Sequence, residues 1–219
     1  MVSFEDIKHD PAISTYIKKA DDSLACLGFT EHGFAHVGTV AKTAEYILRS
    51  VHASAHDIEL AKIAAHLHDI GNLVNRSEHS QSGAVMAFRI LLAKGMNAED
   101  VATIVCAIGN HDEGTGVPVD HIAAALILAD KSDVRRSRVR NQDIATFDIH
   151  DRVNYSVTDY SLTVDRDTKD ITLRLEIDPE ISSIMDYFEI FLERMLLCRK
   201  AAEKLGLRFR LKINGQSLI

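Results

Sequence analysis

Apolar residues recur every three to four positions through most of the first 130 residues, which is the spacing of one face of an α-helix. In the segment 34–51 these positions are Val37, Val40, Ala44, Ile47 and Leu48. The same period predicts further helices at residues 13–25, 57–69, 80–93, 97–108 and 118–130. This part of the chain is therefore expected to form a bundle of helices.

The pattern changes after about residue 154. Residues 156–164 and 171–177 alternate with a period of two around the turn sequence DRDTKD, which predicts a β-hairpin. An amphipathic helix at 181–205 and a third alternating segment at 207–213 follow. We therefore expect a mainly α protein, with a helical domain at 1–153 and a β-β-α-β extension at 154–219 packed on it.

Composition narrows the class of protein. The 219 residues are 46% hydrophobic and 26% charged, which is typical of a globular chain with a full core. Three scattered cysteines argue against a disulfide framework and against a cysteine zinc site. No apolar run reaches the length of about 18 residues that a membrane span needs, and the N-terminus lacks the features of a signal peptide. We expect a cytoplasmic protein.

The formal net charge of −7 disfavours a nucleic-acid partner, which would call for a basic surface. Eleven histidines are the most informative feature of the composition, because imidazole and carboxylate are common metal ligands. The dipeptide His-Asp occurs five times, so it means little by itself. His68-Asp69 stands out because it closes the apolar stretch IAAHLHDIG, where buried polar groups need hydrogen bonds or a metal.

Further candidate ligands lie at the predicted helix ends. His36 opens the helix at 34–51, and Asp130 follows the apolar run AAALILAD. His79 begins HSQSGA, where Gly83 one turn later would let another backbone come close, and His111 lies in GNHDEGTG. Four histidines and two aspartates suit iron, manganese or another divalent metal.

His36, His68-Asp69 and Asp130, in this order and at the ends of apolar helices, resemble the HD-domain superfamily of metal-dependent phosphohydrolases. The resemblance covers about residues 30–135 and implies a helical HD-domain bundle. The segments HDIGN, HSQSG and NHDEGTGVP are also similar to motifs of the HD-GYP cyclic-dinucleotide phosphodiesterases. However, Asn72 and Asn110 replace a lysine and a histidine of that branch, and its GYP segment is shortened here, which argues against cyclic-dinucleotide cleavage.

His79 and His111 also resemble ligands of the two-metal HD hydrolases that split diadenosine tetraphosphate. The HD-type di-iron oxygenases use the same ligand set, so ligand identity does not separate the branches. The resemblance implies two divalent ions, with iron, manganese and another transition metal as the main alternatives and magnesium also open. One ion is expected on His36, His68 and Asp130, and the other on His79 and His111, with Asp69 bridging them.

The expected reaction is hydrolysis of a phosphorylated small molecule, a nucleotide being favoured, by metal-activated water. Asp69 is assigned as a catalytic residue. Lys131 is expected to contact phosphate. Asp112 and Glu113 are candidates for a proton shuttle, or for orienting His111. An oxygenase and a catalytically silent nucleotide sensor stay open as alternatives.

Several other features receive a more conservative interpretation. His32 lies one turn before His36, but a surface role is favoured over ligation, and His66 is expected to point away from the site. The arginines at 135, 136, 138 and 140 are interpreted as a solvated face that could also receive phosphate. The helix at 181–205 is expected to form core or the contact of a homodimer rather than part of the catalytic site, and the substrate is expected to be selected by loops 72–79 and 112–120, with the tail as a further candidate.

Overall fold

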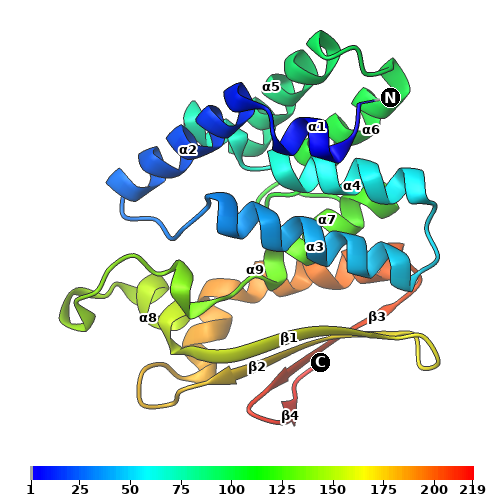
Figure 1. Cartoon of the computed structure of the whole chain (residues 1–219). Coiled ribbons are helices and arrows are strands. Elements are labelled where there is room, and N and C mark those ends of the chain that lie inside the picture. The colour runs from blue at the N-terminus through cyan, green and yellow to red at the C-terminus, as the bar shows by residue number, and fades with distance from the viewer. Residues whose placement is uncertain (1) are drawn as a thin grey trace.

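A computed structural model describes residues 2–219 (Figure 1). Its helical part contains α1 (Phe4–Lys8), α2 (Pro11–Cys26), α3 (Phe34–Ser50), α4 (Ala55–Leu67), α5 (His79–Ala93), α6 (Ala98–Gly109), α7 (His121–Ser132) and α8 (Ile149–Ser156). Short 3-10 helices lie at Ile70–Leu73, Arg136–Arg138 and Ile144–Thr146. The C-terminal part contains β1 (Val157–Asp165), β2 (Asp170–Ile177), α9 (Ile184–Lys204), β3 (Arg208–Ile213) and β4 (Gln216–Ser217). A mainly helical domain with a β-β-α-β extension is confirmed, while α1, α8 and β4 were not predicted.

Local capping explains where the helices differ from the predicted ranges. The helix α4 begins at Ala55 rather than at residue 57, because the hydroxyl of its N-cap Ser54 accepts the backbone N–H of Asp57. The helix ends at Leu67, so the predicted extent to residue 69 was too long. Similarly, α7 begins at His121 rather than at 118, because Asp120 caps it by accepting the N–H of Ala123.

The sheet has the order β1-β2-β3-β4. The hairpin pairs β1 with β2 in antiparallel register, and β3 returns parallel to β2 after the crossover through α9. Apolar side chains of β2 and β3 pair on one buried face, at Ile171↔Phe209, Leu173↔Leu211 and Leu175↔Ile213. The period-two pattern therefore corresponds to a sheet with one covered face.

The long helix α9 lies between this sheet and the helical part (Figure 1). It packs against α7 on one side and β3 on the other. The buried residues Tyr187, Phe191, Met195 and Cys198 belong to the same core as the helical part. This packing brings α9 next to the end of α7 that carries Asp130. Within residues 2–219, no helix combines the length and apolar character that crossing a membrane requires.

Candidate metal centre

Six predicted ligands meet in one cluster because the ends of five helices converge there. Four of them, Asp69, His79, His111 and Asp130, line a cavity of about 340 Å³, and His36 and His68 lie directly behind the two aspartates. Four of the six lie at helix ends: His36 is in the first turn of α3, His68 caps the C-terminus of α4, His79 is the first residue of α5, and Asp130 lies in the last turn of α7. Asp69 directly follows His68, and His111 lies just beyond α6.

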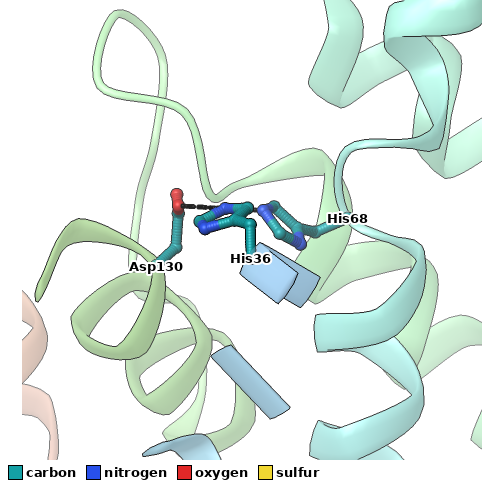
Figure 2. A group of neighbouring side chains, drawn as sticks. All are labelled: His36, His68 and Asp130. Carbon is teal, nitrogen blue, oxygen red and sulfur yellow. Dashed lines mark ion pairs between the residues drawn. The ribbon is translucent and has the colours of Figure 1, made fainter. Parts of the chain in front are cut away.

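His36, His68 and Asp130 form one compact group of potential ligands (Figure 2). Oδ1 of Asp130 lies 3.3 Å from Nε2 of His36 and 3.7 Å from Nε2 of His68. Both histidines are fully buried, and only 11% of the Asp130 side chain is exposed. The three side chains could hold one divalent ion.

A second group contains His68, Asp69 and His111. Asp69 presents Oδ2 to His68 at 3.0 Å and Oδ1 to Nε2 of His79 at 3.5 Å. Nε2 of His79 lies 3.2 Å from Nε2 of His111. Because its two oxygens face different histidines, the Asp69 carboxylate is placed to bridge two ions, as the sequence predicts.

The hydrogen bonds of the four rings fix which nitrogen faces the cavity. In each ring Nδ1 must donate, because its partner is a carbonyl or a carboxylate oxygen. The acceptors are Asp133 Oδ2 for His36, Ala65 O for His68, Arg76 O for His79 and Ile108 O for His111. Every Nε2 therefore directs its lone pair towards the cluster of candidate ligands when the imidazole is neutral, which is the form that binds a metal.

Within residues 2–219, three buried atoms at this centre have no hydrogen-bond partner, namely Nε2 of His36, Nε2 of His68 and Oδ2 of Asp69. A buried polar atom without a partner is destabilising, so native proteins rarely contain such a cluster without a ligand. The unpartnered atoms are nitrogen and carboxylate oxygen, the donor types that divalent transition metals prefer. The residues present therefore fit a divalent metal centre.

The pKa values of the histidines at this centre also favour a positive charge beside the two aspartates. Burial lowers the pKa of His68, but the carboxylates of Asp69 and Asp130 outweigh it and raise that pKa to about 10. Burial and the charge of His68 lower the pKa of His111 to about 3. A proton on His68 therefore offsets part of the negative charge of the two aspartates, and a bound cation would replace it.

Two glycines let the 3-10 helix after Asp69 approach α5. A Cβ on Gly71 would lie 2.0 Å from the carbonyl oxygen of His79 and 2.4 Å from the amide nitrogen of Gly83. This confirms the expected close backbone contact at Gly83. Gly71 does not end a helix, because α4 already ends at Leu67. Gly71 instead allows the contact that positions His79 beside Asp69.

Lys131 lies in the same cavity, with Nζ 2.8 Å from Oδ2 of Asp130 and 3.4 Å from Oε1 of Glu113. Burial would raise the pKa of Glu113, but the charges of Arg194 and Lys131 lower it to about 2. Glu113 is therefore ionised near neutral pH, which argues against its role as a proton donor. Oδ1 of Asp112 lies 4.0 Å from Nε2 of His79.

Neither acidic residue orients His111, because its Nδ1 donates to the carbonyl of Ile108. The orienting carboxylate of this centre is Asp133, which the sequence interpretation missed and which binds Nδ1 of His36 at 2.7 Å. Its position one turn after Asp130, at the end of α7, was the available signal. Asn72, which donates to Oδ1 of Asp69 at 3.0 Å, was also missed as a positioning residue.

The remaining sequence expectations have mixed outcomes. His66 points away from the centre and packs edge-on against Phe4. The surface role favoured for His32 was wrong, because His32 lines the cavity and its ring centroid lies 5.5 Å from that of His36. Arg138 is buried and lines the cavity instead of forming part of a solvated face.

Helix α9 is also part of this site, contrary to the expectation of a purely structural role. Its residues Ile190, Phe191 and Arg194 line the cavity together with the ligands. The β-β-α-β extension therefore contributes one wall of the candidate metal centre. No signal in the local sequence of α9 indicates this, since the contact depends on how the helix packs on α7.

Comparison with known proteins agrees with the sequence resemblance. The family model described as HD domain matches residues 33–152, which include all six candidate ligands. The chain is 25% identical over 160 residues to uncharacterized protein MJ1020 of Methanocaldococcus jannaschii, and the match covers 63% of this chain. It spans 61% of the length of that relative.

Two solved structures are also similar. One is a predicted HD superfamily hydrolase from an uncultured Thermotogales bacterium, with 25% identity and a TM-score of 0.46 over 58% of this chain and 69% of that chain. The other is a Lactobacillus plantarum protein with 18% identity and a TM-score of 0.46, over 90% of this chain and 89% of that chain.

Proposed function

The chain belongs to the HD domain family, and from this premise we propose that it is a metal-dependent phosphohydrolase that cleaves a phosphoester or phosphoanhydride bond of a nucleotide-type substrate. The observation that carries the proposal is the convergence of four histidine Nε2 atoms on one cluster with two aspartates, with each Nδ1 bonded elsewhere. This arrangement supports metal-activated water as the nucleophile.

Two divalent ions would be held by the predicted ligand set, with His36, His68 and Asp130 on one side and His79 and His111 on the other side of Asp69. When bound, they would supply a water molecule of lowered pKa and polarise the phosphoryl oxygens. The chain itself needs no serine or cysteine nucleophile. Its part is to hold neutral imidazoles in the required tautomer and to keep Asp69 and Asp130 ionised.

Charge in the cavity supports an anionic substrate. Lys131 carries its proton, because the carboxylates of Asp130 and Glu113 outweigh the effect of burial and raise its pKa. Its ammonium group lies next to the ligand Asp130 and is placed to bind a phosphoryl oxygen of the reacting group. Arg76 and Arg138 add positive charge at the cavity wall.

The nucleotide part of the proposal rests on size and lining. A volume of about 340 Å³ is at the small end of the range of about 300–1,000 Å³ for small-molecule sites, and suits one compact ligand. The aromatic side chain of Phe29 lines the cavity and is 40% exposed, so it offers a face against which a flat ring can stack.

The test is release of inorganic phosphate from a panel of nucleotides by the full chain loaded in turn with Mn²⁺, Fe²⁺ and Mg²⁺. We expect release from one class of nucleotide, and a loss of at least about 100-fold in Asp69→Ala, since a bridging ligand of both ions is removed. Asp159→Ala is the matched control, because Asp159 is exposed on β1.

Three results would overturn the proposal. Nucleotide binding without turnover under all of these metals would favour a sensor. Consumption of oxygen by the iron-loaded protein, with no release of phosphate from any member of the panel, would favour an oxygenase. Equal turnover by wild type and Asp69→Ala would show that the reaction takes place elsewhere.

A further inference from the structure

Arg194 is the charged residue that the C-terminal extension contributes to the cavity. It lies in the middle of α9, and its Nε donates to Oε1 of Glu113 at 2.6 Å. The guanidinium carbon lies 4.2 Å from the ring centroid of Phe191, so the aromatic face restricts its position. The side chain is 21% exposed and faces the same cavity as Asp69 and Asp130.

Most of the hydrogen-bonding capacity of Arg194 is unused. A guanidinium has five N–H donors, and within residues 2–219 only Nε of Arg194 has a protein acceptor. Nη1 and Nη2 of Arg194 do not belong to the buried atoms that lack a partner, so their four N–H donors are accessible to solvent or to a ligand. If the ion pair served only to hold α9 in place, it would be strongest as a bidentate pair, with two guanidinium nitrogens of Arg194 bound to the carboxylate of Glu113.

Arg138 shows the contrast within the same cavity. Its Nε donates to the carbonyl of Glu31 at 2.9 Å, and its Nη1 donates to the carbonyl of Asp133 at 2.7 Å. Arg138 therefore connects two segments of backbone through two donors. Arg194 makes one hydrogen bond, to the side chain of Glu113. The planar edge formed by its Nη1 and Nη2 groups remains available and matches the geometry of a phosphate group.

The position of Arg194 relative to the metal ligands determines which part of a substrate it can contact. Oε1 of Glu113 binds both Arg194 and Lys131, and Lys131 in turn lies against Asp130. Among the described residues, Arg194 forms no ion pair with the ligand Asp130 and is connected to it through Glu113 and Lys131. A phosphoryl group at the ions would contact Lys131, whereas Arg194 is placed for an anionic group next to it.

We propose that Arg194 binds a second, non-reacting phosphate of the substrate, so that the site prefers ligands with two adjacent phosphates over ligands with one. This inference rests on the proposed function and specifies its substrate class further. It also assigns a role to the extension, which completes the substrate site by supplying this arginine from α9. Glu113 holds the side chain in place when no substrate is bound.

The experiment compares two phosphonates that cannot be hydrolysed, methylphosphonate with one anionic group and methylenediphosphonate with two. Their binding to the Mn²⁺-loaded full chain is measured by titration calorimetry, and the metal content is checked afterwards. We expect wild type to bind the diphosphonate more tightly. Arg194→Met should lose roughly tenfold of that affinity, as expected for a charged hydrogen bond, while binding of methylphosphonate stays within about twofold.

Arg199→Met is the matched control, because Arg199 is exposed on the same helix and does not line the cavity. It should leave both affinities unchanged. If circular dichroism shows that Arg194→Met is misfolded, the comparison is made with Arg194→Gln instead, because glutamine keeps a hydrogen-bond donor for Glu113 and removes the charge. The same selective loss is expected for it.

An unchanged preference for the diphosphonate in the folded Arg194 variant would overturn the inference, as would an equal loss for both ligands, which indicates a purely structural ion pair. In either case the proposed phosphohydrolase would stand. If metal-loaded wild type bound neither phosphonate, the proposed function would fail first and the role of Arg194 with it.

Discussion

Nδ1 of His36 lies 2.7 Å from Oδ2 of Asp133, and this bond determines which ring nitrogen faces the metal centre. Burial opposes ionisation of Asp133, but the hydrogen bonds from His36 and Arg135 hold the pKa of its carboxyl below the usual value. The carboxylate therefore remains charged and increases the basicity of the opposite nitrogen, Nε2. Asp133 acts on the metal through His36 without contacting it.

Asp133→Asn should weaken binding of the metal while leaving all six ligands in the chain. The neutral amide no longer polarises His36 and can present an N–H in place of an acceptor. We expect the affinity for Mn²⁺ to fall by about 10- to 100-fold, measured by competition with a chelator. Asp159→Asn, on the exposed side of β1, is the control. An affinity within twofold of wild type would contradict this role.

Gly71→Ala should disturb the centre through the backbone. The added methyl group overlaps the carbonyl oxygen of His79, so α5 must shift away from Asp69. We expect the free energy of unfolding to fall by about 2 kcal/mol or more in urea titrations, together with weaker metal binding. Gly38→Ala is the matched control, because no atom lies within 4 Å of a Cβ there.

Gly38 lies inside α3, where alanine is favoured over glycine by up to about 1 kcal/mol. The control should therefore be as stable as wild type or slightly more stable. Equal stability of the two variants would show that the contact between Gly71 and α5 is not required.

His66 should make the protein less stable in mild acid. Burial lowers its pKa to about 4, whereas the unfolded chain titrates near 6.5, so the unfolded chain binds the proton more readily. Its contribution to stability is complete above pH 6.5 and decreases as the pH falls towards 4. Between pH 7 and pH 5 the loss from this residue is about 2 kcal/mol.

His66→Leu removes this contribution. The free energy of unfolding, measured by urea in the presence of a chelator, should fall less between pH 7 and pH 5 in the variant than in wild type. Both proteins keep their other histidines, so the comparison isolates one ring. An identical fall in the two proteins would mean that His66 is protonated in the folded state.

The candidate ligands could be proposed from the sequence because each lies at or just beyond the end of a strongly periodic helix. His36 and Asp130 follow directly from where the apolar pattern starts and stops. The HD dipeptide at 68–69 was selected by its apolar context among five copies. Helix boundaries were less certain, since Ser54 and Asp120 cap their helices through local hydrogen bonds that hydrophobic periodicity does not record.

The rest of the site depends on tertiary packing. Arg194 is far from the ligands in sequence, and only the packing of α9 on α7 brings it to the cavity. His32 resembles a surface residue because it precedes α3 in a loop, yet that loop forms part of the cavity wall. Asp133 follows a buried helix and carries no motif of its own, so its bond to His36 becomes visible only in three dimensions.

The most direct test of the account is the number of metal ions per chain, by elemental analysis of protein purified without a chelator and supplemented with Mn²⁺ or Fe²⁺. Two ions are expected in wild type. One ion is expected in His79→Ala and in His111→Ala, whose Nε2 atoms lie 3.2 Å apart in the intact chain. A wild-type chain that holds no metal under these conditions would contradict the central claim.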